Sequence, residues 1–294
     1  MGTVIRSIAI NNASAESGVA TLIAETADRC LQNAGVDIGA VGMLINTGVY
    51  TENHLLEPAS ATLIHRRLLD KNKQAKRKSG SLGNLLSFDL HNGGGGIVNA
   101  LQVVDGFISS GEIEYGLIVS GDVKPKIGKV ENYKYSSSAA AVLVSKEKSK
   151  PGFIKFKTET FPEFKENITS TTRWKDGGLH LVNKKSNDYL KNAVDCAAKT
   201  IQNFFDEELL GWKDVDLICT SQNPLGFVTE LQKKLKIKNK IVCFQGDIEI
   251  YSSGLLYSMN HIIEKEEFKN CVYVLFLTVG AGITVSLAYY NNKL

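Results

Sequence analysis

An internal duplication constrains the fold most strongly, because strand-like and helix-like segments recur in the same order along the chain. In the first half, short apolar runs bounded by turn residues predict strands at 4–10, 41–48, 85–90, 115–122 and 138–145. The second half repeats the plan from about residue 188, with predicted strands at 214–224, 240–247, 271–280 and 282–290. This repeat unit is far longer than the 20–50 residues of solenoid repeats. The pattern therefore predicts a duplicated α/β domain.

Helical patterns separate the predicted strands, as an α/β sheet requires. Apolar residues at helical spacing predict helices at 17–34, 59–69, 97–109, 188–205 and 253–264. We accordingly divide the chain into an N-terminal half (1–150), an insertion or cap (151–187) and a C-terminal half (188–294). The middle segment shows no clean periodicity. Two interpretations of it stay open: a cap that carries binding residues, or a variable surface excursion.

Composition excludes several classes of protein. The net charge of +3 is too small to indicate a nucleic acid or an anionic membrane as the main partner. The five cysteines have no CxxC spacing, so we expect reduced thiols and neither a disulfide framework nor a metal site. With no signal peptide or membrane-spanning run readable, we expect a soluble, cytoplasmic protein. The basic run Lys71 to Lys78 indicates either a solvated loop or a docking surface for an acidic carrier protein.

A strand runs into a glycine turn and then a helix at FDLHNGGGGIVNAL. Such an elbow directs one residue toward a helix N-terminus, where free backbone N–H groups favour anions and thiolates. A nucleotide-binding loop is the competing interpretation. The turn has neither GxGxxG spacing nor a terminal Lys-Ser/Thr, so this interpretation is weak.

The elbow resembles that of beta-ketoacyl-ACP synthase III. In that family the elbow reads Asp, apolar, three mostly small residues, Cys, small, Gly, and the matching run here is Asp89 to Gly96. Further similarity extends through DLICTSQNPLGFVTELQKKL, QGDIEIYSSGLLYSM and TVGAGITVS, so it covers nearly the whole chain in order. The resemblance implies a thiolase fold, with two duplicated βαβαβ halves in a five-layer αβαβα arrangement.

All three catalytic side chains of the resembled synthases are replaced. The family's Cys nucleophile corresponds to Gly94, its His to Ser221 and its Asn to Asp247. An ionised Asp donates no hydrogen bond and opposes the charge of an enolate. We therefore expect the covalent condensation to be abolished. The resemblance also implies an oxyanion hole formed by the N–H groups of Gly94 and Ala281, although these glycine-rich turns are equally consistent with close packing at a dimer centre.

Other residues are candidate replacements for the nucleophile or base. His91 precedes the glycine turn and is either a pocket residue or a residue that ties the turn together. Ser221 and Asp247 form an unusual candidate pair, because no His accompanies them. Cys219 and Cys243 lie in apolar strand runs and are expected to be core thiols. The N-terminal segment that helps such synthases hold CoA is shortened here, and we predict no resident cofactor.

The resemblance implies a non-condensing subunit of acyl-thioester biosynthesis, of the fatty acid or polyketide type. Its expected partner is a ketosynthase III-like paralogue, as a heterodimer, or a second copy, as a homodimer. The expected ligand is an acyl carrier protein or an acyl-CoA. Two alternatives stay open: an acyltransferase that works without a Cys nucleophile, and a module that binds a carrier-linked chain without turnover.

Overall fold

Two five-stranded sheets form the centre of the protein. The computed structural model describes residues 2–12, 18–75, 85–126, 128–149, 151–237, 240–245 and 249–293. The first sheet has the order β1-β6-β4-β2-β3, with β1 Gly2–Asn11, β2 Val41–Asn46, β3 Leu86–Asp89, β4 Tyr115–Asp122 and β6 Ser138–Glu147. The second has the order β11-β10-β12-β13-β7, with β7 Gly152–Thr160, β10 Leu217–Thr220, β11 Ile241–Val242, β12 Tyr273–Gly280 and β13 Thr284–Asn291.

The two sheets have the same topology, strand for strand. In the first, β2 is parallel to β3 and β4, while β6 is antiparallel to β4 and β1. In the second, β10 is parallel to β11 and β12, while β13 is antiparallel to β12 and β7. Strands β1, β2, β3, β4 and β6 thus correspond to β7, β10, β11, β12 and β13. This correspondence is the structural form of the predicted duplication.

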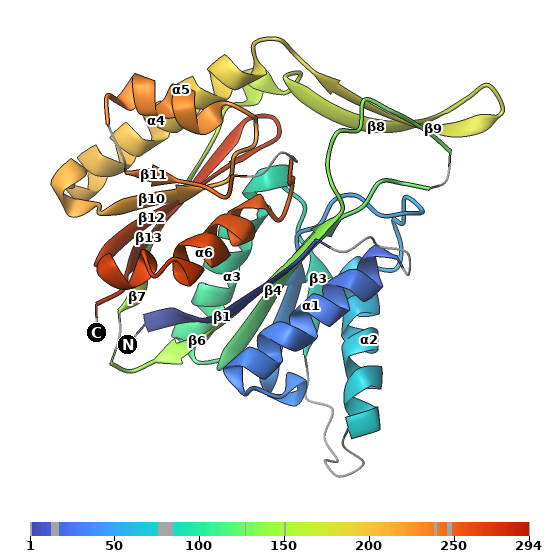
Figure 1. Ribbon diagram of the computed structural model, residues 1–294, viewed down its shortest axis with the longest axis horizontal. Coiled ribbons are helices and arrows are strands. Elements are labelled where there is room, and N and C mark those ends of the chain that lie inside the picture. Colours follow the sequence, from blue (N-terminus) through green and yellow to red (C-terminus); the bar gives the residue numbers. More distant parts are fainter. Residues whose placement is uncertain are drawn as a thin grey trace.

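Helices and sheets alternate in five layers (Figure 1). Helices α1 (Val19–Ala34) and α2 (Ser60–Ala75) cover the outer face of the first sheet. Helices α3 (Gly96–Ser110) and α6 (Gly254–Glu264) lie between the sheets, and α4 (Tyr189–Glu208) and α5 (Phe227–Leu235) cover the second sheet from outside. The predicted five-layer αβαβα arrangement is confirmed. Within the residues that the structure describes, no helix is long and apolar enough to cross a membrane.

Helix α1 shows how the sequence pattern produces one outer layer. Its buried face includes Leu22, Ile23, Ala27, Cys30 and Leu31, which recur at helical spacing. Burying one such leucine or isoleucine contributes about 1.5–3 kcal/mol. The helix ends where Gly35 adopts a left-handed conformation (φ 66°), and its N–H bonds the carbonyl of Gln32.

Two segments differ from the expectations. The interval 151–187 was expected to be an insertion, yet β7 lies within it and pairs with β13, so the second sheet already begins at Gly152. Only the later part of the interval leaves the sheet. There β8 (Ile168–Lys175) and β9 (Gly178–Lys185) form a projecting hairpin with β5 (Lys129–Glu131) along β9 (Figure 1). In addition, α2 continues to Ala75, into the stretch 70–84 that was expected to be a loop.

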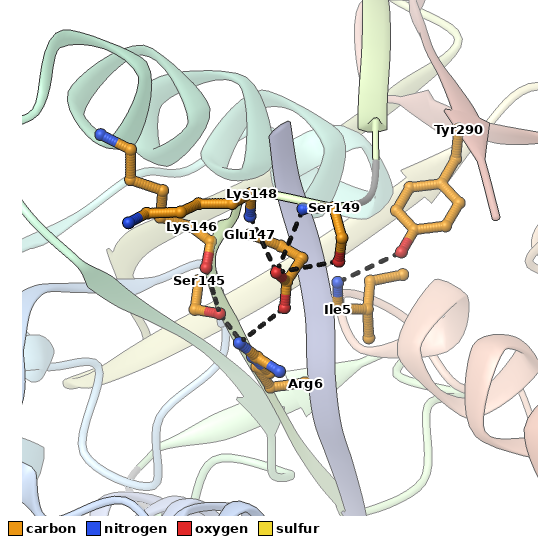
Figure 2. Close-up of polar contacts among 8 residues, drawn as sticks. All are labelled: Ile5, Arg6, Ser145, Lys146, Glu147, Lys148, Ser149 and Tyr290. Carbon is orange, nitrogen blue, oxygen red and sulfur yellow. Dashed lines mark hydrogen bonds and ion pairs between the residues drawn. The ribbon is translucent and has the colours of Figure 1, made fainter. Parts of the chain in front are cut away.

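Hydrogen bonds join the two halves at both ends of the seam between the sheets. Figure 2 shows one end, where the N–H of Ile5 on β1 donates to the hydroxyl of Tyr290 on β13 at 3.4 Å. Beside it, Arg6 contacts Ser145 and Glu147 of β6. The apolar core between the sheets includes α3 and α6 residues such as Leu101 and Leu256, both fully buried.

Buried polar residues form the seam near the carboxyl ends of the central strands. The carboxylate of Asp122, fully buried at the end of β4, accepts hydrogen bonds from the N–H groups of Val49 and Tyr50. It also accepts from the N–H and the hydroxyl of Ser252, in the other half. The paired hydroxyls of Ser120 and Ser252 lie 2.8 Å apart. This network fixes the loops that surround the candidate site.

Candidate functional site

The elbow forms as the sequence predicts: β3 ends at Asp89, Gly93–Gly95 make one 3-10 turn, and α3 begins at Gly96. Asp89 is a structural residue here. Its carboxylate accepts hydrogen bonds from the N–H groups of Ser60 and Ala61 at 2.7 and 2.8 Å, and so caps the start of α2.

Two of the elbow glycines lie so close to neighbouring residues that a side chain at either position would clash. Gly93 has a left-handed backbone (φ 49°), and a Cβ there would lie 2.6 Å from the hydroxyl oxygen of Tyr251. A Cβ on Gly94 would lie 2.8 Å from the backbone carbonyl oxygen of Val279, on β12. Real Cβ atoms essentially never approach so closely. The structure therefore has no room for a side chain at Gly94 unless the elbow or β12 shifts.

The predicted oxyanion-hole turn lies against this elbow. The backbone nitrogen of Ala281 lies 3.4 Å from the position of a Cβ on Gly93. The turn at 280–282 and the glycine turn are thus in contact, as the resemblance implies.

The other predicted site residues have different surroundings. Ser221 follows β10, is buried, and packs against the start of α6, where a Cβ on Gly254 would lie 2.9 Å from its Cβ. The side chain of His91 is exposed. Asp247 lies outside the described residues. The structure therefore brings the turn that contains Gly94 into contact with the turn that contains Ala281, and it places Ser221 against Gly254, the first residue of α6.

Sequence reasoning missed a cluster of aromatic rings beside the elbow. This tyrosine cluster consists of Tyr50, Tyr133, Tyr135 and Tyr251. Tyr135 and Tyr251 are stacked with centroids 4.4 Å apart, and Tyr50 lies 5.2 to 5.6 Å from each of the other three rings. The one available signal was the spacing of Tyr133 and Tyr135, which places both rings on one face of an extended segment just before β6.

The tyrosine cluster is uncharged at neutral pH. Burial raises the pKa of Tyr50 to about 12, and it also raises the pKa values of Tyr133, Tyr135 and Tyr251 well above the usual value for a phenol. The Asp122 carboxylate and the neighbouring rings add to these shifts by repulsion. Phenols of this kind donate hydrogen bonds but do not act as bases. The cluster fills space next to the elbow with neutral rings.

No replacement nucleophile appears among the thiols. Cys219 is fully buried and Cys243 is also buried, which confirms their predicted core positions. Burial raises the pKa of Cys243 to about 11 and that of Cys219 well above its usual value. In the described part of the chain, no group of three or more His, Cys, Asp or Glu side chains could hold a metal ion.

Comparisons with known proteins agree with the elbow resemblance. Residues 88–162 match the family model described as 3-oxoacyl-[acyl-carrier-protein] synthase III. The beta-ketoacyl-[acyl-carrier-protein] synthase III of Wolbachia pipientis subsp. Culex pipiens is 23% identical over 274 residues, which are 90% of this chain and 80% of that protein. The corresponding synthase of Baumannia cicadellinicola is 24% identical over 92% of this chain and 84% of its own length.

Solved structures show the same fold. The 3-oxoacyl-[acyl-carrier-protein] synthase III of Aquifex aeolicus superposes with a TM-score of 0.79 at 16% identity, covering 99% of this chain and 100% of that one. OleA of Xanthomonas campestris, solved with bound lauric acid and lauroyl-CoA, superposes with a TM-score of 0.78 at 16% identity, covering 99% of both chains. The chain therefore has the thiolase fold and resembles the 3-oxoacyl-[acyl-carrier-protein] synthases III in sequence over most of its length.

Proposed function

We propose that this chain is a synthase III-like subunit of acyl-thioester metabolism that does not itself catalyse condensation and that pairs with an active ketosynthase. One observation carries the proposal: the elbow offers no nucleophile and no room for one. Gly94 faces the carbonyl of Val279, and Tyr251 occupies the space beside Gly93. A covalent acyl-enzyme needs a nucleophile at such a position.

The edge of the first sheet supports an association with a second chain. Strand β3 is the last strand of that sheet, paired with β2 on one side only among the described strands. Its first residue, Leu86, is 50% exposed. An exposed edge strand pairs readily with another chain. The edge therefore suits either an intact paralogue or a second copy.

The test uses purified chain alone and together with a ketosynthase III paralogue that retains its Cys. Both samples receive an acyl-CoA and a malonyl-carrier protein, and carbon dioxide release is followed. We expect no release from the chain alone, and co-elution with the paralogue as one complex in size-exclusion chromatography. A Cys→Ala version of the paralogue is the control, because it should bind equally well and abolish release.

Turnover by the chain alone, at rates typical of intact synthases, would overturn the proposal. Slow acyl transfer without decarboxylation would instead favour the acyltransferase alternative, with His91, Ser221 or Asp247 as base. Substituting these three residues separately would then identify the base, because only its loss would stop acyl transfer.

A further inference from the structure

A cavity of about 450 Å³ lies at the base of the projecting β8–β9 hairpin. Its walls come from segments far apart in the sequence: the stretch after β5, strand β9, Leu225 and Glu249. Ligand sites in proteins typically occupy about 300–1,000 Å³. The cavity therefore has the size of a small-molecule site.

Two polar atoms in the walls are buried without a hydrogen-bond partner in the described part of the chain. They are Nδ2 of Asn183 and Oε1 of Glu249. The side chains of Asn183 and Glu249 are 9% and 7% exposed. The orientation of Asn183 is fixed because its Oδ1 accepts a hydrogen bond from Tyr50 at 3.2 Å. A buried polar group without a partner is unfavourable, so a ligand that satisfies both groups gains binding free energy.

Lys185 lies near enough to Glu249 to offset its charge, but it forms no hydrogen bond with Oε1 of Glu249. Its Nζ lies 3.6 Å from Oε1 of Glu249, beyond hydrogen-bond distance. The Lys185 side chain is 43% exposed, so it has room to turn toward solvent and uncover the carboxylate. Oε1 of Glu249 can therefore accept a hydrogen bond from a hydroxyl or ammonium group of a ligand.

The cavity carries excess positive charge. Lys134, Lys184 and Lys185 line it against the single carboxylate of Glu249. Lys134 and Lys184 are exposed, and no ion pair holds either of them among the residues described. Two uncompensated ammonium groups at one cavity attract an anion.

The inner wall of the cavity separates it from the elbow. Tyr135 lines the cavity and stacks on Tyr251, whose hydroxyl in turn adjoins Gly93. A ligand in the cavity therefore meets the tyrosine cluster and does not reach Gly94. Its binding is independent of whether the elbow supports any chemistry.

We propose that this cavity binds a small organic anion, a carboxylate or a phosphate monoester, that also carries a hydroxyl or ammonium group. Lys134 and Lys184 hold the anion, and the amide of Asn183 donates to it. Glu249 accepts the hydrogen bond of the ligand's hydroxyl or ammonium, and the ring of Tyr135 covers its carbon atoms. The anionic group of the ligand thus contacts the two lysines and Asn183, and its hydroxyl or ammonium group contacts Glu249.

The test is isothermal titration calorimetry of the purified chain with four probes. Glycerate and glycerol 3-phosphate carry an anion and hydroxyls, whereas propionate and propyl phosphate carry the anion alone. We expect the hydroxylated member of at least one pair to bind about tenfold more tightly than its partner, because only it reaches Glu249. Comparing the pairs tells a carboxylate site from a phosphate site.

Variants locate the binding. Lys184→Gln should weaken binding about tenfold, because it removes a charge-assisted contact from an exposed position where folding is unaffected. Lys148→Gln removes the same charge from an exposed residue outside the cavity and should leave binding unchanged. Glu249→Met should lower the preference for the hydroxylated probes.

Three outcomes would overturn the proposal. One is the absence of binding by all four probes at about 10 mM, which corresponds to less than about 3 kcal/mol of binding free energy. Another is equal affinity of the wild type and Lys184→Gln. The third is binding of neutral pantetheine without any binding of the anions, which would assign the cavity to an uncharged chain.

Discussion

The hydroxyl oxygen of Tyr251 lies 2.6 Å from the place where a Cβ on Gly93 would sit. Glycine at position 93 and tyrosine at position 251 are therefore mutually dependent, although 158 positions separate them along the chain. The left-handed backbone of Gly93 (φ 49°) adds a second reason for glycine there.

This dependence predicts a double-mutant cycle. Gly93→Ala should destabilise the wild type through both the left-handed backbone and the contact with the Tyr251 hydroxyl. In a Tyr251→Phe background the 2.6 Å contact with the hydroxyl is gone, while the backbone part, about 1–2 kcal/mol, and a milder 3.3 Å contact with the ring remain. Urea unfolding should therefore show that the double variant loses less unfolding free energy than the two single variants' losses added together.

Gly177→Ala is the control for this cycle. Gly177 also has a positive φ (75°), but a Cβ there meets nothing within 4 Å. Its substitution should cost only the backbone part and should not couple to residue 251. Equal costs of Gly93→Ala in both backgrounds would mean that the hydroxyl does not restrict the elbow.

Gly94→Cys should fail to restore condensation and should also destabilise the protein. The new Cβ would press against the carbonyl of Val279, and overpacking of this kind costs about 1–3 kcal/mol. Gly106→Cys, on helix α3, which follows the elbow, meets nothing within 4 Å and is the matched control, expected to be neutral or stabilising. Carbon dioxide release and urea unfolding measure the two effects. Strong turnover by Gly94→Cys would reveal an enolate-stabilising group not identified at the elbow.

The five native thiols should react slowly in the folded protein. Burial raises the pKa values of Cys30, Cys196 and Cys243 each to about 11. Thiols with such values are about one part in a thousand thiolate at pH 8. Iodoacetamide labelling followed by mass spectrometry should be slow until denaturant is added. Rapid labelling of one cysteine in the native state would instead identify a candidate nucleophile.

Acid stability should depend on Glu159, at the end of β7. Burial raises the pKa of this carboxyl, but hydrogen bonds from Asn203 and Thr200 and the charge of Lys157 outweigh that effect and lower it overall. Because the folded pKa is the lower one, the stabilisation is present above the unfolded pKa of about 4.3 and is lost as pH falls through the folded pKa.

Glu159→Gln should therefore reduce the difference in unfolding free energy between pH 7 and pH 4. Glu112→Gln, at an exposed position, is the control and should leave that difference unchanged. Identical pH profiles for the wild type and Glu159→Gln would show that these contacts do not discriminate between the protonation states.

The exposed edge of the first sheet gives a prediction about assembly. Leu86→Lys places a charge at the edge strand β3 and should weaken association with a second chain. Leu209→Lys makes the same change at a residue that is 91% exposed beyond α4, and it should have no effect. Multi-angle light scattering over a concentration series measures both. An unchanged oligomeric state in Leu86→Lys would place the interface elsewhere.

The sequence predicts most of the layers because their elements carry strong periodic signals. The buried face of α1 and the apolar strands β4 and β12 are readable locally, and the duplication reinforces them. Strand β8 was missed because most of its residues from Ser170 to Lys175 are exposed, so it lacks an apolar alternation. Strand β7 was missed for a similar reason, since Lys155 and other polar residues interrupt it.

The candidate site was predictable where it depends on local motifs. The elbow and the turn at Ala281 follow from short glycine-rich runs, and the structure brings them into contact. The tyrosine cluster was not predictable, because Tyr50, Tyr135 and Tyr251 meet only when strands from both halves are assembled. Contacts over such sequence separations leave no periodic trace in a single sequence.

The buried carboxylate of Asp122 has a consequence for the order of events during synthesis. Two of its four hydrogen bonds come from Ser252, which leaves the ribosome some 130 residues later. Until then the Asp122 carboxylate lacks the two hydrogen bonds from Ser252, and the surface of the first half that packs against the second half stays uncovered. The first half is therefore not expected to complete its folding alone, and its final packing forms only after the second half has been synthesised. A nascent chain arrested before residue 252 should remain open to proteases at the end of β4.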